Sequence, residues 1–164
     1  MAILVESGRA AVATAIVGQP LHLAWGSGDV VWDSSTLPPA PSTGATTLVA
    51  EVGRRVVTQT QYCTPKTGGE IIVSQGQFTA TPNNAPSKYL YLRFAYDFMD
   101  AANVDIRELG VFVGGTMNGA GTNGYWDTSR TPPTNPGQLL VLENIQKLHR
   151  SQQVKQQFEF VIQF

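Results

Sequence analysis

Residues 88–98 read KYLYLRFAYDF and carry the clearest strand signal in the chain. Large apolar and aromatic side chains occupy every second position, and the positions between them hold Tyr, Arg, Ala and Asp. Because successive side chains of a strand point to opposite faces, this period of two predicts a strand with one face in the core. The residues expected on that face are Leu90, Leu92, Phe94, Tyr96 and Phe98.

Further strands are predicted on both sides of this one. A turn at 99–103 leads into DIRELGVFV at 105–113, and two such neighbours are expected to pair as antiparallel strands. The remaining candidates are rich in β-branched or alternating apolar residues. They lie at 21–25, 55–62, 70–81 with a break at Gly76, 139–148 and 154–164.

Two helices are expected beside these strands. The Ala-rich stretch 7–17 follows a potential N-cap, Ser7, and stops at Gly18, as helices do. A second short helix is predicted at 46–54. The fold class is therefore mainly β (α+β): an antiparallel sheet or sandwich with an N-terminal helix, one further short helix and long Gly- and Pro-rich loops, in a single domain of residues 1–164.

Composition excludes several classes of protein. With 164 residues the chain can bury one core, and its charged residues make up only 14%. The formal net charge of −1 argues against a nucleic-acid partner and against polybasic membrane attachment, and no apolar run approaches the roughly 20 residues of a membrane span. A lone Cys63 excludes an internal disulfide framework and is compatible with a reducing compartment.

No constellation of residues indicates catalysis, a metal or a cofactor. The GxGxxG pattern at 119–124 is not followed by a helix, which a dinucleotide site requires. Asp29 and Asp33 lack the alternating oxygen ligands of a calcium loop. His22 and His149 stand far apart, and no GxSxG motif occurs, so the chain is expected not to be an enzyme.

Opposite charges stand beside apolar residues in two segments. With so few charges available, they predict partly buried ion pairs that link the 46–54 segment to the strand at 105–113, with Arg107 pairing with Glu51 or Glu108. The residues expected in these structural pairs are Glu51, Arg54, Arg55, Arg107 and Glu108.

Four motifs, in their order along the chain, carry a resemblance. They are the GSGD loop at 26–29, the Pro-rich stretch after it, TTLVAEVGRR at 46–55 and IRELGVF at 106–112. Together they resemble the tail-proximal, attachment domain of tail-fibre and baseplate-associated proteins of tailed bacteriophages. In that group a similar Gly-Asp loop precedes an LVNE…R helix, and an IREIGLF strand completes the domain.

The resemblance implies a structural protein of the virion tail, assembled in the host bacterial cytoplasm, that joins a fibre or peripheral baseplate component to the tail. Its implied partners are copies of itself and other tail, baseplate or fibre proteins. Low surface charge and long loops ordered by neighbours agree with this role. Interface contacts are expected from the N-terminal helix and from two loops, through Gly26, Gly28, Asp29, Trp32, Asp33, Asn118, Asn123, Tyr125 and Trp126.

Three other readings stay open. A carbohydrate-binding module contacting a host glycan would need Trp25, Trp32, Tyr125 and Trp126 to form an exposed platform. A small hydrolase would use His22 or His149. A capsid or neck component would fit the same composition as a tail component.

Overall fold

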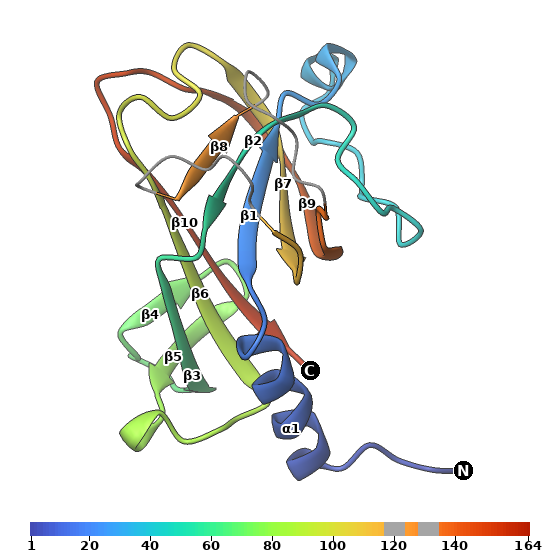
Figure 1. The fold of residues 1–164 in the computed structure, drawn as a ribbon, viewed down its shortest axis with the longest axis vertical. Helices are drawn as coiled ribbons and strands as arrows, with labels where there is room; N and C mark the ends of the chain where they lie inside the picture. Colours follow the sequence, from blue (N-terminus) through green and yellow to red (C-terminus); the bar gives the residue numbers. More distant parts are fainter. Residues whose placement is uncertain (117–123, 128–134) are drawn as a thin grey trace. The chain divides into compact units, whose positions relative to one another are not determined.

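The computed structural model describes residues 1–116, 124–127 and 135–164 (Figure 1). It is mainly β, with two five-stranded antiparallel sheets and an N-terminal helix. The chain divides into two compact units, and each holds one sheet. Unit 1 comprises residues 1–19, 57–94 and 157–164, and unit 2 comprises residues 20–56 and 95–156.

Unit 1 contains the sheet ordered β10-β6-β3-β5-β4 and the helix α1. Strands β6 and β10 extend slightly beyond its boundaries. The elements are α1 (Glu6–Val17), β3 (Gln59–Pro65), β4 (Ile71–Val73), β5 (Gly76–Ala80), the 3-10 helix η2 (Pro82–Asn84), β6 (Tyr89–Tyr96) and β10 (Gln156–Gln163).

The predicted period-two strand is β6, and its alternation is confirmed. Leu90, Leu92 and Phe94 are fully buried. Its other face also contributes to a core, because Tyr91 packs in a cluster with Cys63, Ile71, Phe78 and Val161. Phe98 lies beyond the end of β6 and is exposed, so its predicted place in the core is wrong.

The predicted N-terminal helix is confirmed with a different start. α1 begins at Glu6 with Val5 as N-cap, and no side chain caps it, so Ser7 lies inside the helix. Gly18 ends it as expected. Within the helix Ala13 is buried.

Unit 2 contains the sheet ordered β8-β2-β1-β7-β9. The indole ring of Trp25 stacks on Tyr96 with 3.7 Å between centroids, and Tyr125 meets both rings edge-on. A separate hydrophobic cluster in this unit consists of Phe112, Ala24 and Leu48. The elements are β1 (Leu21–Gly26), the 3-10 helix η1 (Val30–Ser34), β2 (Glu51–Val56), β7 (Asp105–Val113), β8 (Tyr125–Asp127) and β9 (Gln138–His149).

The predicted helix at 46–54 is wrong. Residues 46–50 are irregular, and β2 starts at Glu51 and pairs with β1 and β8. Gly53 and the β-branched Val49 and Val52 make the stretch a weak helix former, so strand pairing prevails over local propensity. The N–H groups of Val49 and Ala50 bind a side chain of β7 instead of carbonyls of a helix.

The predicted pairing of 88–98 with 105–113 is also wrong. β6 pairs with β3 and β10, whereas β7 pairs with β1 and β9 in the other sheet. The connection 97–104 is longer than a tight hairpin turn and changes sheets. Likewise the strand predicted at 55–62 is two strands, because β2 ends at Val56 and β3 begins at Gln59 in the other sheet.

The strand predicted at 70–81 is a hairpin of β4 and β5 that turns before Gly76, whose φ of 143° suits glycine.

None of the helices in the described part of the chain is long and apolar enough to cross a membrane.

Candidate protein interface

Three connections meet at one end of the sheet of unit 2. β1 ends where β7 begins, since Gly26 pairs with Glu108, and β9 ends opposite Asp105. The connections 27–50, 97–104 and 150–155 therefore leave the sheet at this end, at the top of Figure 1. We call these three segments the loop end.

The loop end displays apolar side chains to solvent. Val30 is 70% exposed, Val31 67% and Val49 70%. In the described part of unit 2, the exposed large apolar residues other than Val56 all belong to the loop end. They are Val30, Val31, Leu37, Val49, Phe98, Met99 and Val154.

A buried carboxylate ties two of these segments together. Glu108 on β7 is 1% exposed, and its oxygens accept the backbone N–H groups of Gly28 at 3.2 Å, Val49 at 2.9 Å and Ala50 at 2.7 Å. A Cβ atom on Gly26 would collide with this carboxylate, which explains the glycine. The segments that carry Val30 and Val49 are thus anchored to one side chain.

The neighbouring Arg107 fixes η1. Its guanidinium makes two parallel hydrogen bonds of 2.8 Å to the carboxylate of Asp33 and one of 2.9 Å to the carbonyl of Ser27. These hydrogen bonds hold the pKa of Asp33 well below its usual range. At the start of η1 the side chain of Asp29 accepts the N–H of Val31 at 2.9 Å. The conformation of this valine-bearing turn is therefore set by charged side chains.

Arg150 holds the other two segments of the loop end, 97–104 and 150–155, through hydrogen bonds to their backbone. It is 2% exposed and donates to the carbonyls of Asp97, Ser151 and Val154. Nearby, Arg55 donates to Asp100 at 2.6 Å, and burial raises the pKa of Asp100. Phe98, Met99 and Val154 are thus carried by segments that a buried arginine holds in place.

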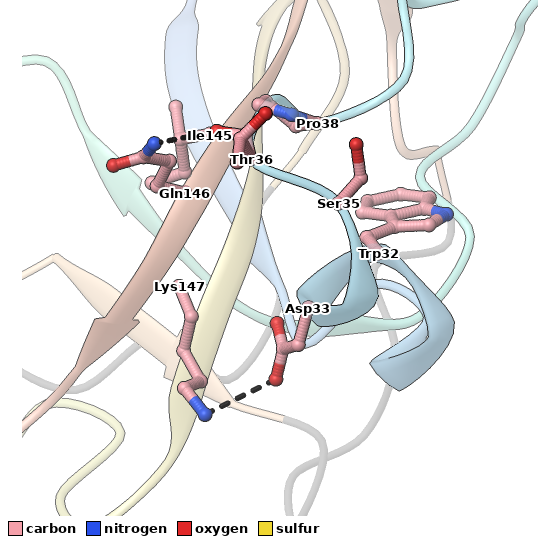
Figure 2. A pocket seen from close by; sticks show the side chains of 8 residues that line it. All are labelled: Trp32, Asp33, Ser35, Thr36, Pro38, Ile145, Gln146 and Lys147. Atoms are coloured by element: carbon pink, nitrogen blue, oxygen red, sulfur yellow. Dashed lines mark hydrogen bonds and ion pairs between the residues drawn. The ribbon is translucent and has the colours of Figure 1, made fainter.

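A shallow pocket of about 300 Å³ opens between the 32–38 segment and β9 (Figure 2). The ammonium group of Lys147 lies 3.1 Å from Asp33, and the side-chain amide of Gln146 donates to the carbonyl of Thr36 at 2.9 Å. Since Asp33 and Lys147 pair with each other, the pocket offers little to a small charged ligand. It continues the surface of the loop end along β9.

The residues predicted to contact partners differ in their exposure to solvent. Asp29 is exposed, and Trp32 is half-buried beside Gly28, whose φ of 56° suits glycine. Tyr125 and Trp126 are 4% and 5% exposed, because they are buried in unit 2, and they leave little side-chain surface for the predicted contact with a partner. Asn118 and Asn123 lie outside the described residues.

The charged residues singled out in the sequence are placed in separate contacts. Arg54 binds Glu51 within β2, and its guanidinium lies 3.9 Å from the ring centroid of Phe112. Arg107 binds Asp33 in place of Glu51 or Glu108, because η1 brings Asp33 beside β7. Asp100 and Arg150 were not predicted, since in sequence both stand in polar turns that look exposed.

The two histidines that a hydrolase would use lie in different surroundings. His149 is exposed, and its Nδ1 lies 2.7 Å from a carboxylate oxygen of Asp105. His22 is 3% exposed, and burial, followed by the charge of Arg54, lowers its pKa to about 4. Burial raises the pKa of the Cys63 thiol to about 11. Among residues 1–116, 124–127 and 135–164 no cluster of His, Cys, Asp and Glu could hold a metal ion. Trp25, Tyr125 and Trp126 are buried, so the exposed sugar platform does not form.

A known protein family matches this chain. The model of a family described as "Baseplate wedge 3 tail fiber network component" matches residues 1–164, which is the whole chain. No curated protein matches the chain.

Proposed function

The chain belongs to the family of baseplate wedge 3 tail fiber network components, and from that premise we propose that it is an adaptor that attaches fibres to the baseplate through its loop end. Family membership gives it a structural role in the baseplate of a phage tail and a place in the tail of the virion. It also confirms the resemblance found in the sequence.

The observation that carries the proposal is the pairing of buried charges with exposed valines. Glu108 and Arg107 are nearly inaccessible to solvent, and both bind the segments that display Val30, Val31 and Val49. Removing charges from water costs several kcal/mol per ion unless hydrogen bonds replace the lost hydration. A chain with few charges places two of them where they hold apolar loops rigid, which favours binding because little loop entropy is then lost.

A protein is the partner that suits this surface. Contiguous exposed apolar side chains mark sites of protein contact. In the described loop end Asp33, Asp97 and Asp100 each lie beside a cationic side chain, so these carboxylates are not free to bind a metal ion. The family description implies partners among other baseplate and tail fibre network proteins.

The proposal is tested by placing charges on the loop end. We expect Val30→Arg/Val49→Arg to lower the number of copies per virion about tenfold, since charged side chains at the centre of an apolar contact remain unpaired. Ile72→Arg is the matched control, because Ile72 is 67% exposed but lies on β4 of unit 1. Equal incorporation of the loop-end variant and the control, measured by quantitative mass spectrometry of purified particles, would contradict the proposal.

The same proposal makes the chain a non-enzymatic protein present in several copies, assembled in the host cytoplasm. The burial of His22 and of the Cys63 thiol agrees with this part of the proposal. Neither nucleic acid nor membrane is proposed as a partner.

A further inference from the structure

The edges of the two sheets are protected to different degrees. Exposed edge strands invite pairing with another chain, and proteins guard them with very short strands, prolines, lysines or covering loops. Strands β4 and β8, each at the end of its sheet, have 3 residues. The long edge strand β9 is flanked by the Pro-rich segment, whose Thr36 and Pro39 carbonyls accept the side chains of Gln146 and Asn144.

The edge strand β10 is neither short nor guarded by a proline or lysine of its own, although Arg9 of α1 donates to the carbonyl of Phe164 just beyond its end at 2.8 Å. It has 8 residues, reads QQFEFVIQ, and contains no proline, lysine or glycine. Its charged residue, Glu159, accepts hydrogen bonds from Gln157 on the same strand and from Tyr91 on β6. The carboxylate is therefore held over its own sheet and does not protect the edge.

The outward-facing backbone groups of β10 follow from its register. The N–H of Phe164 donates to the carbonyl of Lys88 at 2.9 Å, so this residue faces the β6 side. Because the direction alternates along an antiparallel strand, the groups that point away from β6 belong to the odd-numbered residues. They are Gln157, Glu159, Val161 and Gln163. In the described part of the chain, β6 is the strand beside β10, and none lies on its other side within the sheet (Figure 1).

We propose that β10 pairs antiparallel with β10 of a second copy of this chain, which joins the unit 1 sheets of two protomers into one. The inference rests on the proposed function in one respect: that function places several copies of the chain together, and the inference names the contact between two of them. A two-fold axis at Phe160 places Gln157 opposite the partner's Gln163 and Glu159 opposite the partner's Val161. All outward N–H and C=O groups then find partners, as a self-complementary contact requires.

The composition of β10 favours this register over the one centred on Glu159. Shifting the axis to Glu159 would place two carboxylates directly opposite each other, which destabilises a strand pair. With the axis at Phe160 the half-buried Ile162 lies opposite the partner's Phe158, an aromatic and β-branched pair of the kind that stabilises sheets.

The test uses charges at exposed positions of the full chain. Gln157→Lys/Gln163→Lys places lysines opposite lysines in the dimer, whereas the control Gln157→Glu/Gln163→Lys places opposite charges together. Both sites are exposed, so the protomer should keep its circular dichroism spectrum and Tm. We expect the unmodified chain to sediment as a dimer, the double-lysine variant to weaken dimerisation about tenfold, and the control to restore it.

Sedimentation equilibrium separates the outcomes. A monomeric unmodified chain would overturn the proposal, and so would equal dimerisation of both variants. Loss of the dimer in both variants, with the fold intact, would refute the stated register. None of these results bears on incorporation through the loop end, so failure here is distinguishable from failure of the proposed function.

Discussion

Glu108 satisfies three backbone N–H groups from a position that is 1% exposed. Hydrogen bonds to a charged acceptor are stronger than neutral ones, and leaving buried donors unpaired costs more than the bond contributes. The residue therefore acts as an anchor for irregular backbone that strand pairing cannot hold.

Replacing this anchor should be costly. We expect Glu108→Ala to lower the free energy of unfolding by about 3–5 kcal/mol, because the N–H groups of Gly28, Val49 and Ala50 lose their acceptor. Urea denaturation measures the change. Glu143→Ala, at an exposed position of β9, is the control and should change little. A small effect of Glu108→Ala would mean that the loops are held by other contacts.

His22 makes stability depend on acidity. Its pKa falls from 6.5 to about 4 on folding, chiefly because it is buried, so the unfolded chain binds the proton first. The stability contributed by this residue is complete above pH 6.5 and is lost as the pH falls toward 4, by roughly 3 kcal/mol in total. His22→Gln should remove that part of the slope in a series of denaturation curves; an identical slope in the variant would contradict the assignment.

The structural importance of single charged residues was predictable, because the chain contains few charged residues and each one is noticeable in the sequence. Few charges occur in the sequence, and Arg107 and Glu108 stood out beside apolar neighbours. Their partners were not predictable, because Asp33 and the N–H groups of Val49 and Ala50 reach them only through the path of the 27–50 connection. Nothing in local sequence specifies that path.

At the scale of elements, the strands that could be predicted were those whose apolar residues recur at a regular spacing. Strand β6 alternates over its whole length, and β9 and β10 are also close to their predicted bounds. The 46–56 stretch shows the limit: Leu48 and Val52 fit a helical spacing, but pairing with β1 and β8 makes a strand from Glu51 onward. Sheet membership was likewise invisible, since local sequence does not show that the chain changes sheets at 57–58.

The 3-10 helix η1 should depend on Arg107. We expect Arg107→Ala to increase amide hydrogen exchange at Trp32 and Ser35, whose N–H groups close this turn, because Asp33 loses its bidentate partner. Lys147→Ala is the matched control, since it removes only the half-exposed second partner of Asp33. Unchanged exchange in the Arg107 variant would show that the turn is held by Asp29 alone.

At the scale of the whole molecule, the single domain predicted from the sequence contains two compact units, and whether they unfold together tests that prediction. Each unit is assembled from separate stretches of chain, so neither is a contiguous piece. The 3 tryptophans, Trp25, Trp32 and Trp126, belong to unit 2, and the buried Cys63 belongs to unit 1. The two units therefore carry separate natural probes.

Unfolding should be cooperative across both units. We expect the urea midpoint from tryptophan fluorescence to coincide with the midpoint for labelling of Cys63, because strand β6 continues from unit 1 into unit 2. Labelling should be slow in the folded chain, since the thiol is fully buried and burial raises its pKa to about 11. Separate midpoints would mean that the units unfold independently.

The central claim, that the loop end contacts other baseplate or fibre proteins, is tested most directly by cross-linking mass spectrometry of purified virions. Lys147 and Lys155 lie at or beside the loop end, whereas Lys66 and Lys88 belong to unit 1. We predict links from Lys147 and Lys155 to a different baseplate or fibre protein. Links to such a protein from Lys66 and Lys88 alone, or absence of the chain from the particle, would contradict the account.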